Sequence, residues 1–221
     1  MVRKYFLVLV FAVFVTSGTF AIDKSAGLGG NFAANFDSYK YEGNDTRLQR
    51  TIGGGFFAFF DITFVEVNVG MLFGRIKQEY AYGEWSDEAV NVSYLTLSLY
   101  GKYPFYFDGF SLFPMLGIQY DLGLSSEIYL GSDANGTFTG KYARKKLFWD
   151  SSERFDYMNR FWIKLGVGAD FKFGYVSHLR PSILYGINLG TNYDRKFKEN
   201  ASFVSSYHHG LDIRLAIGFG R

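Results

Sequence analysis

The sequence predicts an all-β protein, an eight-stranded antiparallel transmembrane β-barrel that runs as an up-and-down meander, with four long extracellular loops and short periplasmic turns. Three observations predict it. Apolar and polar residues alternate along eight segments, the polar positions are rich in small residues, and the connections alternate between long and short. A strand has a side-chain period of two, and a membrane barrel needs one apolar face and one enclosed polar face.

The clearest segment is FWIKLGVGADFKF at residues 161–173. Phe161, Ile163 and Leu165 begin one apolar face, whereas Lys164 and Asp170 lie on the other. A helix would mix these charges with the apolar side chains, because its side chains repeat every 3.6 residues. The segment is therefore predicted as a strand with two unlike faces.

The same pattern recurs at residues 27–37, 51–60, 63–73, 90–103, 110–122, 179–191 and 207–219. With these bounds the connections contain 13, 2, 16, 6, 38, 5 and 15 residues, and the first short turn lies near Asp61 and Ile62. Outer-membrane barrels have this asymmetry between long outer loops and short periplasmic turns.

Two alternatives explain the pattern less well. A water-soluble sandwich also has one apolar and one polar face, but glycine weakens strands and its solvent face would favour Thr, Lys and Glu. A transmembrane helix over residues 56–74 would contain Asp61 and Glu66. An acid near a helix centre costs about 2.5–3.5 kcal/mol on insertion scales.

Residues 1–21 are predicted to be a secretory signal peptide, with Arg3 and Lys4 before the apolar run 5–15 and Ala21 at a cleavage point. Residues 22–221 would then form one barrel domain. Removing two of the 23 basic residues leaves 21 against 21 acidic residues, so the mature charge is zero and does not favour nucleic acid as a partner. The chain has no cysteine, which excludes disulfides and thiolate zinc sites.

Two stretches, YGKYPF at 100–105 and FPMLGIQY at 113–120, resemble those of spirochaetal outer-membrane barrel proteins. By pattern, the mature chain resembles the small eight-stranded outer-membrane barrels of the OmpA, OmpW and opacity-protein type. This resemblance implies a location in the outer membrane at the bacterial cell surface, contact with outer-membrane lipid, insertion by the barrel-assembly machinery and a monomeric state. Members often end in an aromatic residue, whereas here Phe219 is followed by Gly220 and Arg221.

The polar faces carry charges of both signs, which are predicted to form a lumen charge network: Glu66, Lys102, Asp121, Lys164, Asp170, Lys172, Arg180, Asp212 and Arg214. Eight strands enclose a lumen that side chains nearly fill. We expect these charges to pair and plug the barrel, and a gated ion path is the alternative. Pro114 and Pro181 remove ladder donors inside strands, so they mark candidate bulges or gaps in the wall.

A second cluster contains Ser205, Ser206, His208, His209 and Asp212. A His–Ser pair oriented by a carboxylate performs acyl transfer, as in a lipid-modifying hydrolase. However, adjacent histidines in a strand face opposite sides, and no nucleophile elbow is present. We therefore expect no enzymatic activity and no catalytic residues, with a lipid A acylase or deacylase as the alternative.

The longest connection carries a basic cluster: Lys141, Arg144, Lys145 and Lys146. It is either a site for sulfated glycans, nucleic acid or lipid phosphate, or a solvated loop balanced by acids, and we expect the second. No metal-ligand spacing, phosphate loop or dinucleotide motif appears, so no cofactor and no metal are expected.

Three functions stay open from the sequence. The first is an anchor for surface loops that meet host or environmental ligands, as in an adhesin or surface antigen. The second is a narrow-channel or lateral-exit transporter of small or hydrophobic solutes, and the third is the lipid-modifying enzyme. Loops vary freely on such scaffolds, so the sequence names no ligand.

Overall fold

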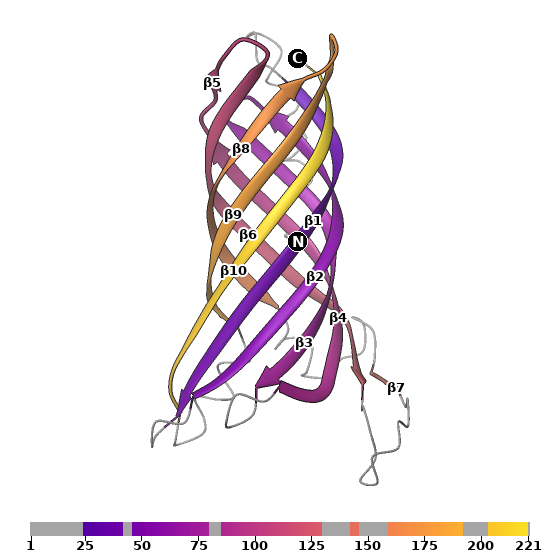
Figure 1. The fold of residues 1–221 in the computed structure, drawn as a ribbon, viewed down its shortest axis with the longest axis vertical. Helices are drawn as coiled ribbons and strands as arrows, with labels where there is room; N and C mark the ends of the chain where they lie inside the picture. The colour runs from indigo at the N-terminus through magenta and orange to yellow at the C-terminus, as the bar shows by residue number, and fades with distance from the viewer. Residues whose placement is uncertain are drawn as a thin grey trace, which may run out of the picture.

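A computed structural model describes residues 24–41, 46–79, 85–129, 142–145, 159–191 and 203–220 of the chain. These residues form β-strands and short connections (Figure 1). The strands are β1 (Lys24–Tyr41), β2 (Thr46–Ile62), β3 (Val65–Glu79), β4 (Trp85–Lys102), β5 (Phe105–Tyr106), β6 (Phe110–Tyr129), β7 (Tyr142–Lys145), β8 (Arg160–Lys172), β9 (Ser177–Thr191) and β10 (Phe203–Gly220). No helix long and apolar enough to cross a membrane occurs in the described part of the chain.

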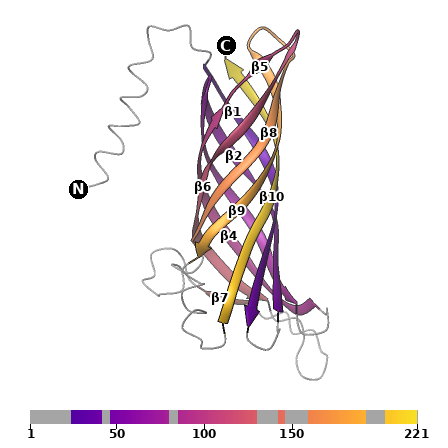
Figure 2. The ribbon, with the colours of Figure 1, turned by 90° about the vertical axis from the view of Figure 1, so that its left-hand side faces the viewer.

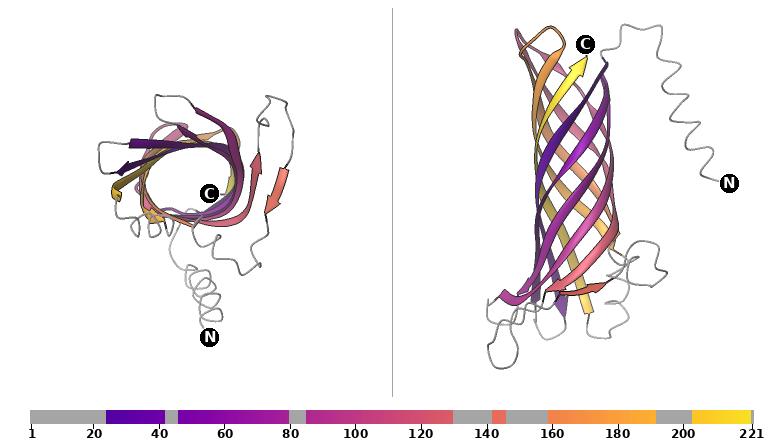
Figure 3. Two further views of the ribbon diagram at one scale, coloured as in Figure 1. Left: turned by 90° about the horizontal axis from the view of Figure 1, so that it is seen from below. Right: turned by 90° about the vertical axis from the view of Figure 1, so that its right-hand side faces the viewer.

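The eight long strands close into one barrel, which Figure 2 shows from the side and Figure 3 shows as a ring from below. Each long strand pairs antiparallel with its neighbour in the chain, and β1 pairs with β10 to close the ring. This confirms the predicted all-β meander. Closure leaves none of the eight long strands as a sheet edge, which a barrel in lipid requires because hydrocarbon offers no hydrogen bonds.

The two ends of the barrel differ. At one end, the turn end, strands are joined by residues 63–64, 103–109 and 173–176. At the opposite end, the loop end, the strands continue beyond the predicted bounds: residues 38–41, 46–50, 74–79 and 85–89 are paired strand. The intervals there therefore narrow to residues 42–45 and 80–84, where longer links were predicted. The prediction stopped where the apolar alternation stops, but backbone pairing continues without it.

Two details at the turn end differ from the sequence prediction. The first tight turn uses Thr63 and Phe64, with Thr63 at a positive φ of 38°. Asp61 lies in β2 and is buried in the lumen. The connection 103–109 contains the additional strand β5, which pairs with β6 through Phe105–Leu112 and Tyr106–Ser111. Gly109 supplies the positive φ of 80° that closes this hairpin.

The outer and inner faces separate apolar from polar residues. Leu165 on β8 is 60% exposed on the outer face, whereas its neighbour Lys164 is 6% exposed inside. The same alternation holds on the other seven long strands, with exposed outward residues that include Leu28, Phe56, Val69, Leu99, Leu116, Ile187 and Leu215. A continuous apolar surface around the whole barrel is far larger than the patches of soluble monomers and fits hydrocarbon.

Aromatic residues gather at the turn end of the outer surface. Phe64 stacks near Tyr103, with 6.0 Å between ring centroids, and Phe107 stacks on Phe110 at 4.8 Å. Tyr175, in the last turn, is 95% exposed. Aromatic girdles of this kind mark the interface between hydrocarbon and headgroups.

Candidate functional site

The barrel lumen holds the concentration of charged groups that the sequence predicts as the functional region. The charges form three layers along the barrel. The inner layer, near the turn end, contains Asp61, Glu66, Lys102, Asp170, His178 and Arg180; the middle layer contains Asp121, Lys164, Asp212 and Arg214; the outer layer contains Asp37, Arg160 and His208. The layers draw on all eight long strands, because alternate residues of each strand point inward.

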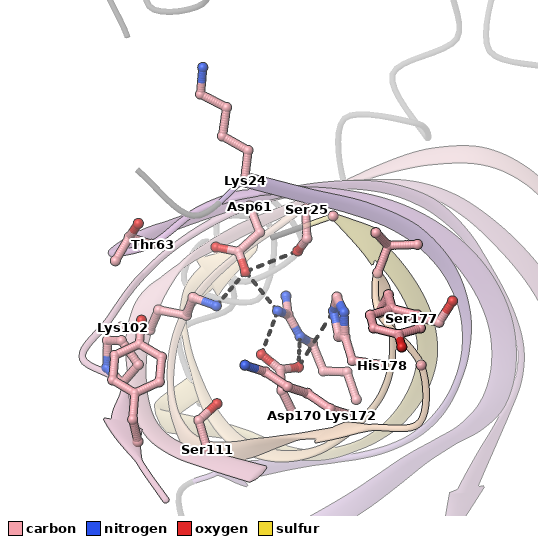
Figure 4. Close-up of a pocket in the computed structure, with 17 residues that line it drawn as sticks. Lys24, Ser25, Asp61, Thr63, Lys102, Ser111, Asp170, Lys172, Ser177 and His178 are labelled. Carbon is pink, nitrogen blue, oxygen red and sulfur yellow. Dashed lines mark hydrogen bonds and ion pairs between the residues drawn. The ribbon is translucent and has the colours of Figure 1, made fainter. Parts of the chain in front are cut away.

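In the inner layer one guanidinium bonds three carboxylates, and Figure 4 shows two of them, Asp61 and Asp170. Arg180 donates to Asp170 through Nε at 2.6 Å, to Glu66 through Nη1 at 2.7 Å and to Asp61 through Nη2 at 2.7 Å. Lys102 Nζ donates to the same Asp61 oxygen at 2.5 Å. Charge-assisted bonds of this number and length hold four strands together through one side chain.

Aromatic rings complete the inner layer. The Arg180 guanidinium lies 4.6 Å from the ring centroid of Phe59 and 5.4 Å from that of Phe113, and Lys102 Nζ lies 4.5 Å from Phe113. These distances are in the range of cation–π attraction. The two cations are therefore neutralised by carboxylates on one side and covered by rings on the other.

The middle layer is centred on Asp212, which is 2% exposed. It accepts hydrogen bonds from Lys164 Nζ at 2.5 Å, Arg214 Nη2 at 2.9 Å and Asn31 Nδ2 at 3.2 Å. Arg214 Nη2 also donates to the Tyr100 hydroxyl at 2.8 Å. Each buried charge in this group thus has a partner, as burial requires.

A second carboxylate, Asp121, belongs to the middle layer. It accepts a hydrogen bond from Trp162 Nε1 at 2.7 Å and one from Gln119 Nε2 at 2.6 Å. Trp162 is 1% exposed, so a large ring fills the lumen here. The neutral donors explain how this acid is held inside without a direct ion pair.

The outer layer is less tightly bonded. His208 Nδ1 lies 2.8 Å from Asp37 Oδ1, but Arg160 Nη2 is 3.6 Å from Asp37 Oδ2. Within the described residues, Asp37 Oδ2 and Arg160 Nη1 have no hydrogen-bond partner. Arg160 lies 5.7 Å from the ring centroid of Tyr94. Ion pairs alone therefore hold this layer less firmly than the inner layer.

Between the layers, bulky apolar side chains fill the barrel. Tyr100, Phe113, Met115 and Leu184 form one buried cluster with 0–2% exposure. Two further buried clusters lie in the lumen: Ala33, Leu72, Val92 and Tyr94, and Phe57, Phe59 and Ala216. A vestibule of about 280 Å³ remains at the turn end, above Arg180 and His178. The lumen thus resembles a packed core, as expected of eight strands.

The structure brings together eight of the nine charges predicted for the network. Lys172 differs: it is the last residue of β8 and is exposed at the mouth of the vestibule. Strand parity points it inward, but the barrel ends before it can be enclosed. The prediction missed Asp37, Asp61, Arg160, His178 and His208. Asp37 and His208 stand on predicted polar faces, while Asp61 and Arg160 were assigned to connections because the strand bounds were drawn too short.

The second predicted cluster is divided by the barrel wall. His208 is buried in the outer layer, whereas His209 points outward and stacks on Phe36 and Tyr185 at centroid distances of 5.7 and 6.2 Å. Asp212 is bonded to Lys164 in another layer. The cluster therefore does not assemble as a triad. Among the described residues no group of three His, Cys, Asp or Glu side chains is placed to hold a metal ion.

Two predictions lie outside the described residues: the signal peptide at residues 1–21, and Lys141 and Lys146 of the basic cluster. Arg144 and Lys145 are placed by their backbone in β7, which pairs with β6 through Glu127–Arg144 and Ser126–Lys145. Their side chains are not part of the description.

Comparison with known proteins finds similarity of fold. No protein-family model and no curated protein match the chain. A major outer membrane protein from Thermus thermophilus is 14% identical, covers 87% of this chain and 99% of its own, and has a TM-score of 0.45. Neisserial surface protein A is 11% identical over 89% and 99% of the two chains, with a TM-score of 0.39. Outer membrane protein AlkL, solved in lipid bilayers, is 13% identical over 93% and 92%, with a TM-score of 0.39.

The chain is an outer-membrane β-barrel protein. Its own geometry carries that statement: a closed antiparallel barrel, an apolar outer surface on every long strand, and a lumen filled by paired charges and bulky side chains. Barrels with lipid-facing exteriors belong to outer membranes, with short turns on the periplasmic side and longer connections outside. The turn end is therefore the periplasmic end, and the loop end is extracellular.

Proposed function

We propose that the barrel is a closed anchor that holds its extracellular connections at the cell surface for interaction with external ligands. The observation that carries this proposal is the filled lumen, in which three charged layers alternate with buried aromatic and aliphatic clusters. A solute would have to break the bonds of Arg180 and displace rings such as Trp162 and Phe113. The protein therefore offers its surface, rather than its interior, to partners.

Conductance in planar bilayers tests the closed state. The purified protein is expected to show no steady ion conductance above that of the bilayer. A large steady conductance would contradict the proposal. The variant Phe113→Ala tests whether the lumen side chains cause the closure, because removing this ring from the inner layer is expected to produce transient openings.

Shortening the longest extracellular connection tests the anchor role. Replacement of the whole connection between β6 and β8, residues 130–158 including β7, by a short turn is expected to leave the folded barrel intact. The reason is that β6 pairs with β4 and β8 without this connection. Heat-modifiable gel mobility measures folding, and binding of whole cells to immobilised host or environmental surfaces measures the function. Unchanged binding by a folded, shortened variant would contradict the role of this connection.

A second candidate is lateral transfer of small apolar solutes, favoured by a groove in the barrel wall. The groove holds about 520 Å³ and contains both strand prolines, Pro114 and Pro181, together with Phe113 and Arg214 of the lumen. The β8–β9 ladder pairs Gly168 with Ser182 and next Phe171 with Leu179. Two residues on each strand therefore lie outside the ladder, and Pro181 is one of them. Proline has no N–H to donate, which explains the interruption.

Uptake of an apolar fluorescent probe by proteoliposomes tests this candidate. Faster uptake than in protein-free vesicles, without ion conductance, would support it. Phe113→Ala should then accelerate uptake further, whereas Phe57→Ala, which removes a lumen ring outside the groove lining, should not. Equal uptake by protein-free vesicles would exclude lateral transfer.

A further inference from the structure

The groove that contains the two strand prolines joins the apolar outer surface of the barrel to its lumen. Strands β6, β8, β9 and β10 contribute its lining. Val167 and Ile183 line it from the outer face, where they are 56% and 43% exposed, whereas Phe113 and Arg214 line it from the lumen. Because alternate residues of a strand point to opposite faces, a lining drawn from both faces means that the groove extends into the wall. Its volume of about 520 Å³ is in the range of sites for small organic ligands.

Two small residues and a proline open the wall at this point. Gly168 faces Ser182 across the β8–β9 ladder, and Pro181 lies in the interruption that follows. A Cβ added at Gly168 would collide with the ring of Phe113, which covers the lumen side of this glycine. The wall is therefore thin between the hydrocarbon side and Phe113.

Arg214 gives the groove a hydrogen-bond donor without an acceptor. Its Nη2 donates to Asp212, Tyr100 and Gln119 at 2.8–3.0 Å. Its Nε is buried and has no hydrogen-bond partner among the described residues. A buried donor left unpaired costs free energy, and an acceptor on a ligand would remove that cost.

The rest of the lining suits hydrocarbon better than water. Among the described residues that line the groove, Ser182 is the only other one with a polar side chain. A buried water typically makes about three hydrogen bonds to polar groups, more than these two side chains offer. The lining therefore fits an occupant that is mostly apolar and carries one acceptor.

The charges around Arg214 favour an uncharged acceptor. The middle layer holds the carboxylates of Asp121 and Asp212 against Lys164 and Arg214. The inner layer adds three carboxylates against two basic side chains and one histidine. Positive charge is therefore not in excess among the described residues of these two layers. A carboxylate on the ligand would not be neutralised, and burial of an unpaired charge is costly.

We propose that the groove binds an uncharged, single-chain apolar molecule with one carbonyl or hydroxyl oxygen, such as an alkyl ester or a fatty alcohol. Its hydrocarbon chain lies against Val167 and Ile183, and its oxygen accepts a hydrogen bond from Arg214 Nε. This inference names the solute class of the lateral-transfer candidate and rests on that candidate for entry from the membrane. Binding at equilibrium does not require transfer.

Arginine side-chain NMR of the full barrel in detergent micelles tests the proposal. The Nε–H resonance of Arg214 is assigned by its absence from the spectrum of Arg214→Lys, which keeps the charge. Methyl decanoate is expected to shift this resonance in a saturable way, and decane, which has no acceptor, should leave it unchanged. Decanoate should bind more weakly by about tenfold or more, because its charge is buried without a partner. Arg180 is the internal control, since its Nε already donates to Asp170 and should not respond.

Paired variants on the outer surface locate the site. Ile183→Trp fills the groove from the lipid side without changing a charged layer, and it is expected to weaken the binding of methyl decanoate by about tenfold or more. Ile187→Trp makes the same change further along β9, outside the groove lining, and should bind like the wild type. Heat-modifiable mobility confirms that each variant is folded.

Three results would overturn the inference: an unshifted Arg214 resonance at the solubility limit of methyl decanoate, equal affinity for decanoate, or equal weakening by the two tryptophan variants. Uptake of the ester by proteoliposomes separates binding from transfer. Uptake without a response of Arg214 would overturn the inference and leave lateral transfer standing. A response of Arg214 without uptake would support the binding site and contradict lateral transfer.

Discussion

The inner and outer charged layers both hold buried charges in ion pairs, but the pairs of the inner layer are shorter and more numerous. In the inner layer, Arg180 bonds three carboxylates at 2.6–2.8 Å and is covered by two aromatic rings. In the outer layer, Arg160 and Asp37 approach only to 3.6 Å. The periplasmic half is therefore the locked part of the barrel, and the extracellular half is the looser part.

This difference suits the proposed anchor. A buried ion pair contributes little by itself, but leaving one member unpaired inside is costly. The three inner carboxylates share Arg180, so loss of this one side chain breaks an ion pair of all three at once. In the outer layer no cation is shared by three carboxylates among the described residues. This layer lies nearest to the connections that we expect to meet ligands. The predictions below test whether stability depends most on the inner layer and least on the outer layer.

The largest effect is expected from Arg180→Met. This change leaves Asp61, Glu66 and Asp170 without their shared cation, and breaking a buried ion pair costs about 3–5 kcal/mol. Urea titration of heat-modifiable mobility in lipid vesicles measures the free energy of unfolding. Lys172→Met is the matched control, because it removes an exposed cation from the same end. Equal free energies of unfolding for the two variants would show that the inner layer does not dominate the stability of the barrel.

An intermediate effect is expected from Asp212→Asn in the middle layer. The amide keeps the size of the side chain and an oxygen that can still accept a hydrogen bond, so Lys164 and Arg214 lose the charge of their partner rather than the whole contact. Hydrogen bonds to charged groups contribute about 1.5–3 kcal/mol, and Arg214 retains its bond to Tyr100, so the loss should fall in that range. The same urea titration measures it. A loss larger than that of Arg180→Met would reverse the proposed order.

The smallest effect is expected from Asp37→Asn in the outer layer. The Arg160 contact is already long, so the change weakens mainly the bond to His208, which is worth about 1 kcal/mol. The unfolding midpoint in urea should move little, and the closed state should persist in planar bilayers. A destabilisation equal to that of Arg180→Met would mean that both ends are locked alike.

The sequence predicted the parts of this fold that depend on consecutive residues. The alternation in residues 161–173 identified β8, and the same pattern located the other seven long strands and the face on which each charge lies. It placed Glu66, Arg180 and Asp212 inside because parity along a strand is a property of consecutive residues. It drew the strands too short at the extracellular end, since the apolar pattern marks only the part that lies in hydrocarbon.

Only the tertiary structure decided which charges meet. Arg180 and Asp61 are 119 residues apart, and Lys164 and Asp212 are 48 apart. Their contacts depend on the register between strands and on the stagger of the closed barrel, which backbone hydrogen bonds set around the whole ring. The same geometry leaves Lys172 at the open mouth and places Arg50 opposite Lys77 on the outer wall. The alternation of residue types determines on which face of the barrel wall a side chain lies, whereas closure of the barrel determines which other side chains it contacts.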